Sequence, residues 1–253
     1  MFIDSHCHLD LLDKKLPIQH ALDNAEQNNV LQMINPSIHQ ESWHTLLELR
    51  KQFTNTKIAL GLHPCFVSDH QIEHLALLEQ TLISEKVSIV GEIGLDKRYL
   101  ENYPVQKTYF TEQLSIAQYL KLPVIIHSVR AHTDIIQILK NMGFTQGGII
   151  HAFYGSLEEA NQYLTLGFKL GIGGLVTYPK NIKLHKVIKQ LPSSAMVLET
   201  DSPDMPLFQQ PQKYNEPANI PIIFSKICAH RTECSRELQK QFWHNTQQAL
   251  KLY

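Results

Sequence analysis

The sequence predicts an α/β fold, a (β/α)8 barrel of the TIM type in which eight parallel strands alternate with helices. The chain has 253 residues, a usual length for one such barrel. About eight short apolar runs recur along it, with helical patterns between them. Several of these runs lead directly into His, Glu or Asp. We therefore expect residues 1–253 to form a single domain with an active site at the carboxyl ends of its strands.

The expected strands are short runs of aliphatic and β-branched residues, as is typical of parallel strands buried on both faces. They are Phe2–Ser5, Val30–Asn35, Lys57–Leu62, Val87–Gly91, Val124–Ile126, Gly148–Ile150, Lys169–Ile172 and Met196–Leu198. The competing fold is an open, doubly wound sheet. Such a sheet usually has fewer strands and a glycine-rich first turn, and neither feature fits this chain.

The intervals between the strands carry helical patterns, as in Val105–Leu120, Ser156–Leu166 and Glu233–Leu252. Ser156 is the expected N-cap of its helix, and Glu159 stands at the spacing of a capping box. The proline-rich stretch Ser202–Pro217 follows the last expected strand. It should form a loop at the active rim.

Composition narrows the classes of function. The formal net charge is −1, so no global field attracts nucleic acid and any recognition of phosphate must be local. The four cysteines form no CxxC pair and are expected to be reduced thiols, as in a cytoplasmic protein. We see no signal segment and no run of membrane-spanning length. We therefore expect neither secretion nor membrane insertion, and no obligate protein partner is evident.

The first expected strand leads into a His-x-His motif. In an extended chain His6 and His8 point to the same side and can chelate one ion, whereas Cys7 points away. Asp4 shares their side, one layer deeper, and could orient a ligating imidazole. A His-x-His motif also occurs by chance, so this interpretation depends on further ligands.

Three further candidates end apolar runs in the middle of the chain. The carboxylate of Glu92 is costly to bury unless it is paired or metal-bound, and its two oxygens can bridge two ions. His127 and His151 would supply nitrogen ligands from neighbouring strands. Each of these histidines alone is more often a buried, hydrogen-bonded side chain than a metal ligand. Together with the His-x-His motif, the three residues predict a metal centre.

The last expected strand leads into acidic residues. Asp201 lies beside the first strand when the barrel closes, so it can bind the same ion as His6 and His8. It can also accept a proton from metal-bound water, whose pKa the ion lowers toward neutrality. Glu199 points to the same side but deeper, and we expect it in a buried network. Nitrogen and carboxylate ligands suit Zn, Mn, Ni or Fe better than Ca.

Other residues on the same rim could contact the substrate. His63 ends the third apolar run and could donate to a phosphate oxygen, although a capping role is equally open. Arg130 follows His127, and its planar guanidinium suits phosphate; a surface salt bridge is the alternative. Asp96 could hold a ligand histidine or shape the loop. Phe153 is the best-placed aromatic residue to stack a base.

In their order along the chain, these motifs resemble those of the TatD family of metal-dependent deoxyribonucleases, within the amidohydrolase-like barrel superfamily. The matching segments span nearly the whole chain: Asp4–His8, Gly61–Pro64, Gly91–Asp96, His127–Arg130, His151–Gly155, Glu199–Pro203 and Asn215–Pro217. The ordered set is highly specific, whereas any single piece is weak. Gly171–Pro179 and Asp204–Pro206 resemble the bacterial YjjV-type branch of the family.

The resemblance implies a metallo-dependent hydrolase that cleaves DNA phosphodiester bonds, often from an end, with a metal-activated water. It implies two divalent ions, with Zn, Mn, Ni, Fe and Mg as candidates. The first ion would be held by His6, His8, Glu92 and Asp201, and the second by Glu92, His127 and His151. Asp201 and Glu92 would then be catalytic. One departure is Lys97–Glu101, where many relatives carry a Tyr/Phe-x-Arg pattern, so the substrate preference need not follow the family's.

Two other classes of function remain open. An amidohydrolase on the same barrel often bridges its ions with a modified lysine of the fourth strand, and Glu92 occupies that place here. A non-catalytic metal-binding protein predicts either a filled coordination sphere or the loss of Asp201 or Glu92, and neither residue is lost. The balanced charge also leaves a small phosphoester open as the substrate beside DNA.

Overall fold

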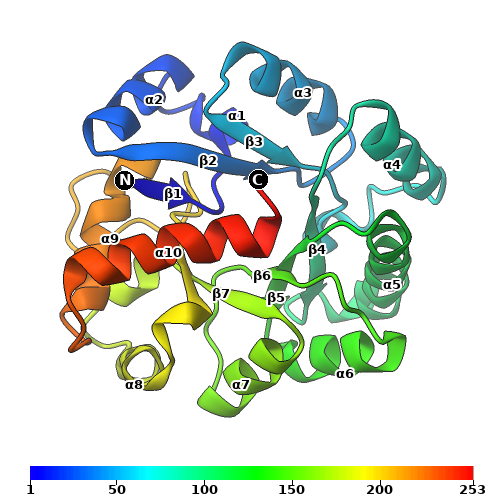
Figure 1. Cartoon of the computed structure of the whole chain (residues 1–253). Coiled ribbons are helices and arrows are strands. Elements are labelled where there is room, and N and C mark those ends of the chain that lie inside the picture. Colours follow the sequence, from blue (N-terminus) through cyan, green and yellow to red (C-terminus); the bar gives the residue numbers. More distant parts are fainter. Residues whose placement is uncertain (253) are drawn as a thin grey trace.

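Eight parallel strands lie at the centre of the molecule, and helices surround them (Figure 1). The computed structural model describes residues 1–252. The strands are β1 (Phe2–Asp4), β2 (Val30–Pro36), β3 (Thr56–Ala59), β4 (Val90–Asp96), β5 (Val124–Val129), β6 (Gly148–Ile150), β7 (Phe168–Ile172) and β8 (Met196–Leu198). Each expected strand is therefore present in its predicted order.

The strands pair as two parallel sheets, β1-β2-β3 and β4-β5-β6-β7-β8. At one seam the backbone N–H of Gly91 donates to Leu60 O, 2.9 Å away. At the other seam Ser5 N–H donates to Leu198 O at 2.9 Å, which makes the first and last strands neighbours. The predicted α/β fold with strands in barrel order is thus confirmed.

The helices occupy the intervals between strands. They are α1 (Leu9–Leu12), α2 (Ile18–Gln27), α3 (Ser42–Gln52), α4 (Glu73–Ser84), α5 (Tyr103–Leu120), α6 (His132–Met142), α7 (Leu157–Thr165), α8 (Ile182–Gln190), α9 (Ile220–Cys228) and α10 (Ser235–Leu250). The predicted capping box of α7 is present, because Ser156 Oγ accepts from Glu159 N and Glu159 Oε2 accepts from Ser156 N. Within residues 1–252 no helix combines the length and apolarity needed to cross a bilayer.

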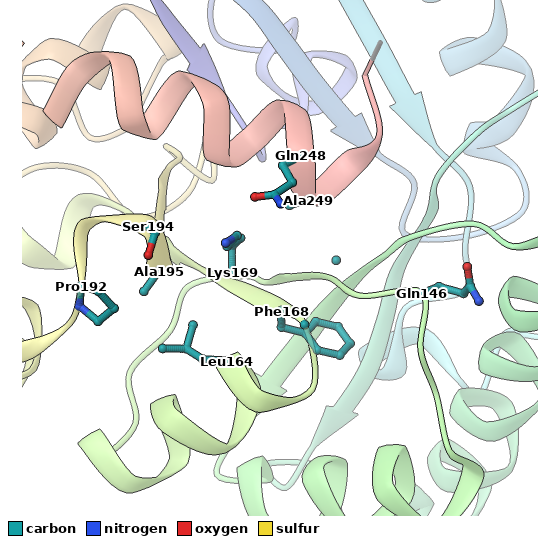
Figure 2. A pocket seen from close by; sticks show the side chains of 11 residues that line it. Gln146, Leu164, Phe168, Lys169, Pro192, Ser194, Ala195, Gln248 and Ala249 are labelled. Carbon is teal, nitrogen blue, oxygen red and sulfur yellow. The ribbon is translucent and has the colours of Figure 1, made fainter. Parts of the chain in front are cut away.

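Helix α10 lies across one end of the barrel (Figure 1). There Ala249 and Leu250 pack against a buried aliphatic layer that includes Ile3, Ile34 and Ile149. Beside this helix a cavity of about 380 Å³ opens at the amino ends of β6 and β7, where Figure 2 shows Lys169 and Gln248. The residues that line it include no histidine and no carboxylate, so this cavity offers no metal ligand.

The fourth strand differs from its prediction. It was expected over Val87–Gly91, but β4 begins at Val90 and continues to Asp96, so Glu92 lies inside the strand. Its pairing with β5 is irregular between Val90 and Ile93. Within this irregularity Glu92 N–H donates to Ser37 O at 3.0 Å, outside the ladder that β4 forms with β5. A local break of this kind can re-aim a side chain.

Candidate metal centre

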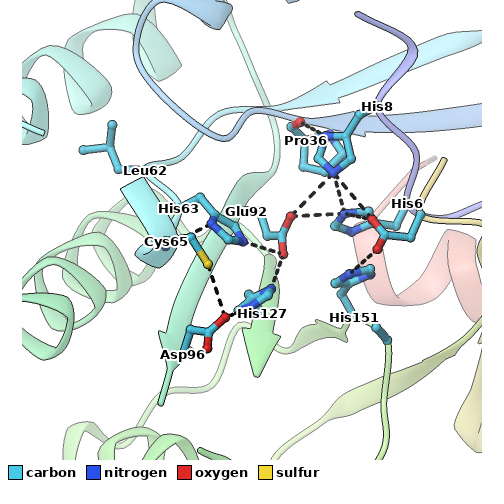
Figure 3. Close-up of polar contacts among 12 residues, drawn as sticks. His6, His8, Pro36, Leu62, His63, Cys65, Glu92, Asp96, His127 and His151 are labelled. Carbon is cyan, nitrogen blue, oxygen red and sulfur yellow. Dashed lines mark hydrogen bonds and ion pairs between the residues drawn. The ribbon is translucent and has the colours of Figure 1, made fainter. Parts of the chain in front are cut away.

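The six predicted ligands converge at one end of the barrel, most of them visible in Figure 3. His6 and His8 follow β1, Glu92 and His127 lie in β4 and β5, His151 follows β6, and Asp201 follows β8. Backbone hydrogen bonds hold the segments beyond the strands in place. Asp201 N–H donates to His6 O and His151 N–H donates to Ile126 O, each at 2.9 Å.

The first group of donor atoms comes from β1, β4 and β8. The Nε2 atoms of His6 and His8 lie 3.1 Å apart, and Glu92 Oε2 lies 3.1 Å from His6 Nε2. Asp201 Oδ1 lies 3.6 Å from His6 Nε2 and 3.7 Å from His8 Nε2. His8 Nδ1 lies 3.1 Å from Pro36 O and donates to it, which leaves the Nε2 lone pair of His8 free for an ion.

The second group adjoins the first through Glu92. Glu92 Oε1 lies 2.9 Å from His127 Nδ1, while Glu92 Oε2 faces His6. Ligand atoms of His6, Glu92 and His151 lie within 4.8 Å of one another. Asp201 also reaches this second group, since its Oδ2 lies 3.5 Å from His151 Nε2. Glu92 is therefore not alone in facing both groups, because Asp201 faces both as well.

The electrostatics of the cluster suit a cation. Burial alone would raise the pKa of Glu92, but its interactions with the imidazoles of His63, His6 and His151 hold it well below its usual value. Burial and the nearby imidazole of His151 lower the pKa of His6, whose Nε2 lies 3.1 Å from His8 Nε2. His6 Nδ1 is buried without a hydrogen-bond partner in the described chain. Converging lone pairs beside ionised carboxylates fit a divalent metal ion.

Asp96 supports the second group from below. Its Oδ2 lies 3.0 Å from His127 Nε2, and both of its oxygens accept from Arg98 Nε at 3.0 Å. Burial would lower the pKa of His127, but Asp96, Cys65 and Glu92 outweigh it and raise that pKa well above its usual value. Asp96 thus both contacts a ligand histidine and anchors its loop, the two roles predicted for it.

The chain is similar to known proteins over almost its whole length. A family model described as TatD related DNase matches residues 3–251. The chain belongs to this family. A metal-dependent hydrolase of Haemophilus influenzae is 35% identical over 254 residues, which cover 96% of this chain and 97% of that protein. YjjV of Escherichia coli K12, also described as a metal-dependent hydrolase, is 36% identical over 97% of this chain and 96% of its own.

The fold of this TatD-family chain matches that of a solved relative. The crystal structure of Escherichia coli YjjV superposes with a TM-score of 0.93 at 35% identity, covering 99% of this chain and 98% of that one. The close relatives and the donor groups agree on one activity class. This TatD-family protein is a metal-dependent hydrolase.

The two residues predicted to contact phosphate lie in different settings. His63 is buried; its Nδ1 accepts from Cys65 N at 3.1 Å and caps a short 3-10 helix, η1 (Pro64–Phe66). Its Nε2 lies 3.3 Å from Glu92 Oε1. The capping role left open for His63 is thus present. Arg130 is exposed, and it makes no ion pair within 4.0 Å among residues 1–252, so the salt-bridge alternative is not observed.

Two expectations about neighbouring residues were wrong. In residues 1–252 Asp4 makes no hydrogen bond to an imidazole ring: its carboxyl group accepts from the backbone N–H of His6 and from Thr200, which ties β1 to the segment after β8. Phe153 is only 2% exposed and packs against His132 and Tyr163, so it cannot stack a base. The motif His151–Gly155 gave no sign that the side chain of Phe153 packs in the interior. The next residue, Tyr154, is 44% exposed.

Glu199 lies in the buried network expected for it. Its Oε1 accepts from Ala152 N at 2.6 Å and lies 3.1 Å from His151 Nδ1, at an angle that makes no hydrogen bond. Gly171 of β7 makes room for this carboxylate, since a Cβ there would lie 1.9 Å from Glu199 Oε2. Glu199 therefore fixes the loop that carries His151.

Cys65 is a site residue that sequence patterns did not reveal. Its Sγ lies 3.2 Å from Asp96 Oδ2, and its ligand atom lies within 4.8 Å of those of His63 and His127 (Figure 3). Its place depends on the turn that His63 begins. No spacing relative to the other ligands could have indicated it.

Proposed function

We propose that this protein is a deoxyribonuclease that hydrolyses phosphodiester bonds of DNA with two divalent ions. One observation carries the proposal. Glu92 turns Oε2 toward His6 at 3.1 Å and Oε1 toward His127 at 2.9 Å, so that one buried carboxylate joins two groups of nitrogen ligands. A carboxylate shared in this way is typical of two-metal sites that act on phosphoesters.

The donor set indicates which residues would hold each ion. Following the resemblance, His6, His8, Glu92 and Asp201 would hold the first, and Glu92, His127 and His151 the second. The donor atoms that lie within 4.8 Å of one another are those of His6, His8 and Asp201 and those of His6, Glu92 and His151, while His127 groups with His63 and Cys65. Bound divalent ions would supply a water of near-neutral pKa and positive charge opposite the phosphate oxygens. The identity of the ions is open among Zn, Mn, Ni, Fe and Mg, because ligand type alone does not select among them.

Asp201 is the residue placed to move a proton. Burial would raise its pKa, but its interactions with His151 and the other imidazoles outweigh burial and keep the carboxylate ionised at neutral pH. Asp201 lines a cavity of about 480 Å³ that Glu92 and His127 also line. Its two oxygens lie 3.6 Å from His6 Nε2 and 3.5 Å from His151 Nε2. We assign to it the general base that takes the proton of the attacking water.

Arg130 and His63 complete the site as groups that position the substrate. Within residues 1–252 the guanidinium of Arg130 has no carboxylate partner, and it lines a cavity that His127 and His151 also line. A planar guanidinium in this position suits the oxygens of a phosphodiester. Burial lowers the pKa of His63, and its Nε2 lies 3.3 Å from Glu92 Oε1, beside the centre where the phosphate would bind.

One experiment tests this function directly. The purified protein is stripped with a chelator, reloaded with one metal at a time, and incubated with end-labelled single- and double-stranded DNA and with bis(p-nitrophenyl) phosphate. We expect cleavage of DNA only after reloading, and none in Glu92→Ala. Hydrolysis of amides or lactones, with DNA and bis(p-nitrophenyl) phosphate left intact, would instead identify an amidohydrolase and overturn the proposal.

A further inference from the structure

The candidate centre lies where two cavities meet. One has a volume of about 490 Å³ and the other about 480 Å³. Five residues line both: His127, Val129, His151, Ala152 and Met205. Because the walls are shared, a substrate bound at the centre can extend from one cavity into the other. We call the cavity of about 480 Å³ the metal arm and the cavity of about 490 Å³ the cationic arm.

The metal arm holds the candidate ligands and an apolar wall. His8, Glu92 and Asp201 line it, and so do Leu11, Ile38 and Phe66. Its one arginine, Arg98, is already paired with Asp96, whose two oxygens lie 3.0 Å from Arg98 Nε. A paired guanidinium has little attraction left for a phosphate. This arm therefore suits the scissile phosphate at the centre and an apolar group beside it.

The cationic arm has a different character. Arg130 and Lys183 line it, both are exposed, and neither makes an ion pair within 4.0 Å in the part of the chain that the structure describes. Tyr154 adds an aromatic ring that is 44% exposed. Lys183 lies in the first turn of α8, on a segment remote in sequence from every candidate ligand.

Two other polar groups of this arm already make hydrogen bonds within the protein. Glu159 Oε2 accepts from Ser156 N at 2.6 Å in the capping box of α7. His132 Nδ1 lies 2.9 Å from Ser128 Oγ and 3.1 Å from Tyr163 Oη. Glu159 keeps its negative charge, and Lys183 is among the groups that lower its pKa. The arm therefore holds two cations and one carboxylate, a net positive lining in a chain whose net charge is −1.

We propose that the cationic arm binds a second phosphate of the substrate, the one adjacent in the nucleotide chain to the phosphate at the centre. Lys183 and Arg130 contact that phosphate, and Tyr154 contacts the base between the two. The ligand class is a nucleoside that carries phosphates at both its 3′ and 5′ oxygens. This inference rests on the proposed phosphodiesterase function, and it makes the enzyme selective for oligonucleotides over single phosphodiesters.

The test measures binding, so that it does not depend on turnover. Dissociation constants of thymidine 3′,5′-bisphosphate, thymidine 3′-monophosphate and thymidine 5′-monophosphate are measured by calorimetry on the metal-loaded protein, with ligand integrity checked afterwards. We expect the bisphosphate to bind at least about tenfold more tightly than either monophosphate. Equal affinities for the three ligands would overturn the proposal.

Charge-removing variants locate the effect. In Lys183→Gln the advantage of the bisphosphate should fall below about threefold. Lys186→Gln, an exposed lysine on the same helix that does not line the arm, should keep the full advantage. An advantage that survives in Lys183→Gln would place the second phosphate elsewhere and contradict the assignment.

Bis(p-nitrophenyl) phosphate, which has one phosphate only, separates this proposal from the proposed function. If the wild-type protein hydrolyses it but shows no preference for the bisphosphate, the arm is wrong and the phosphodiesterase function stands. If neither it nor DNA is cleaved but the Lys183-dependent preference is present, the arm binds such ligands and the phosphodiesterase function is wrong.

Discussion

Glu92 Oε1 lies 2.9 Å from His127 Nδ1, across the neighbouring strands β4 and β5. The contact exists because the pairing of these strands is irregular between Val90 and Ile93, which frees Glu92 from the ladder. The same carboxylate faces His6 with its other oxygen. Replacement of Glu92 should therefore weaken metal binding at both groups of candidate ligands.

Replacing Asp201 with Asn tests the general base. The amide keeps the shape and one ligating oxygen but cannot take a proton, so the variant should retain some metal, bind DNA and cleave it very slowly. Single-turnover rates of the metal-loaded variant measure this. Since Asp201 faces both ligand groups, metal content must be measured in the same samples. Cleavage within a factor of about three of wild type, a difference under ~1 kcal/mol, would exclude the role.

Metal binding should release protons at neutral pH. Burial would lower the pKa of His151, but Glu199, Asp201 and Glu92 outweigh it, so the metal-free imidazole holds its proton. An imidazole must lose that proton to ligate, so metal affinity should fall as the pH falls. Calorimetric titration in buffers of different ionisation heats should show release of about one proton or more per protein.

Glu199→Gln provides the control for this titration. It removes the charge that does most to raise the pKa of His151 while keeping the side chain's shape, so fewer protons should be released. If the wild-type heats do not depend on the buffer, His151 is already neutral and the electrostatic account of this side of the centre is incorrect.

Arg130→Ala should weaken substrate binding without removing metal. The side chain lines the cavity beside His127 and His151, and no carboxylate of the described residues pairs with it, so its loss leaves none of them buried and unpaired. We expect a higher KM or a lower kcat/KM for DNA with unchanged metal content. Loss of metal together with unchanged kinetics per loaded enzyme would show a structural role instead.

Gly171→Ala should disturb the loop of His151 from a distance. The new Cβ would lie 1.9 Å from Glu199 Oε2, an overlap that should destabilise the fold by ~1–3 kcal/mol and weaken metal binding. Denaturant unfolding and metal analysis measure the two effects. In a double variant with Glu199→Ala the clash disappears, so the two losses should be clearly less than additive. Additive losses would place the strain elsewhere.

Much of the fold could be predicted because buried parallel strands consist of short apolar runs that are visible in the sequence. The capping box of Ser156 and Glu159 was equally visible, since it depends on local spacing alone. The extent of β4 was not, because Gly91–Asp96 mixes glycine, apolar and acidic residues without a clear period. There the tertiary pairing with β5 decides the strand.

The candidate ligands could be named from the sequence because polar residues that end apolar runs are few and must meet at one rim. Their partners could not. Asp4 binds the backbone around Thr200, and Phe153 packs against Tyr163, contacts that depend on how distant segments meet. Cys65 lines the metal arm from η1, and Lys183 lines the cationic arm from the first turn of α8. The two-residue period of a strand applies at neither position.

The central claim is that one carboxylate, Glu92, joins two ions, and metal stoichiometry tests it most directly. Wild type and Glu92→Ala are loaded with the same metal, dialysed and analysed by mass spectrometry of the native protein, with circular dichroism to confirm that both are folded. We expect about two ions per wild-type chain and loss of both in folded Glu92→Ala, with activity lower by orders of magnitude. Full occupancy with near-normal turnover in that variant would contradict the account.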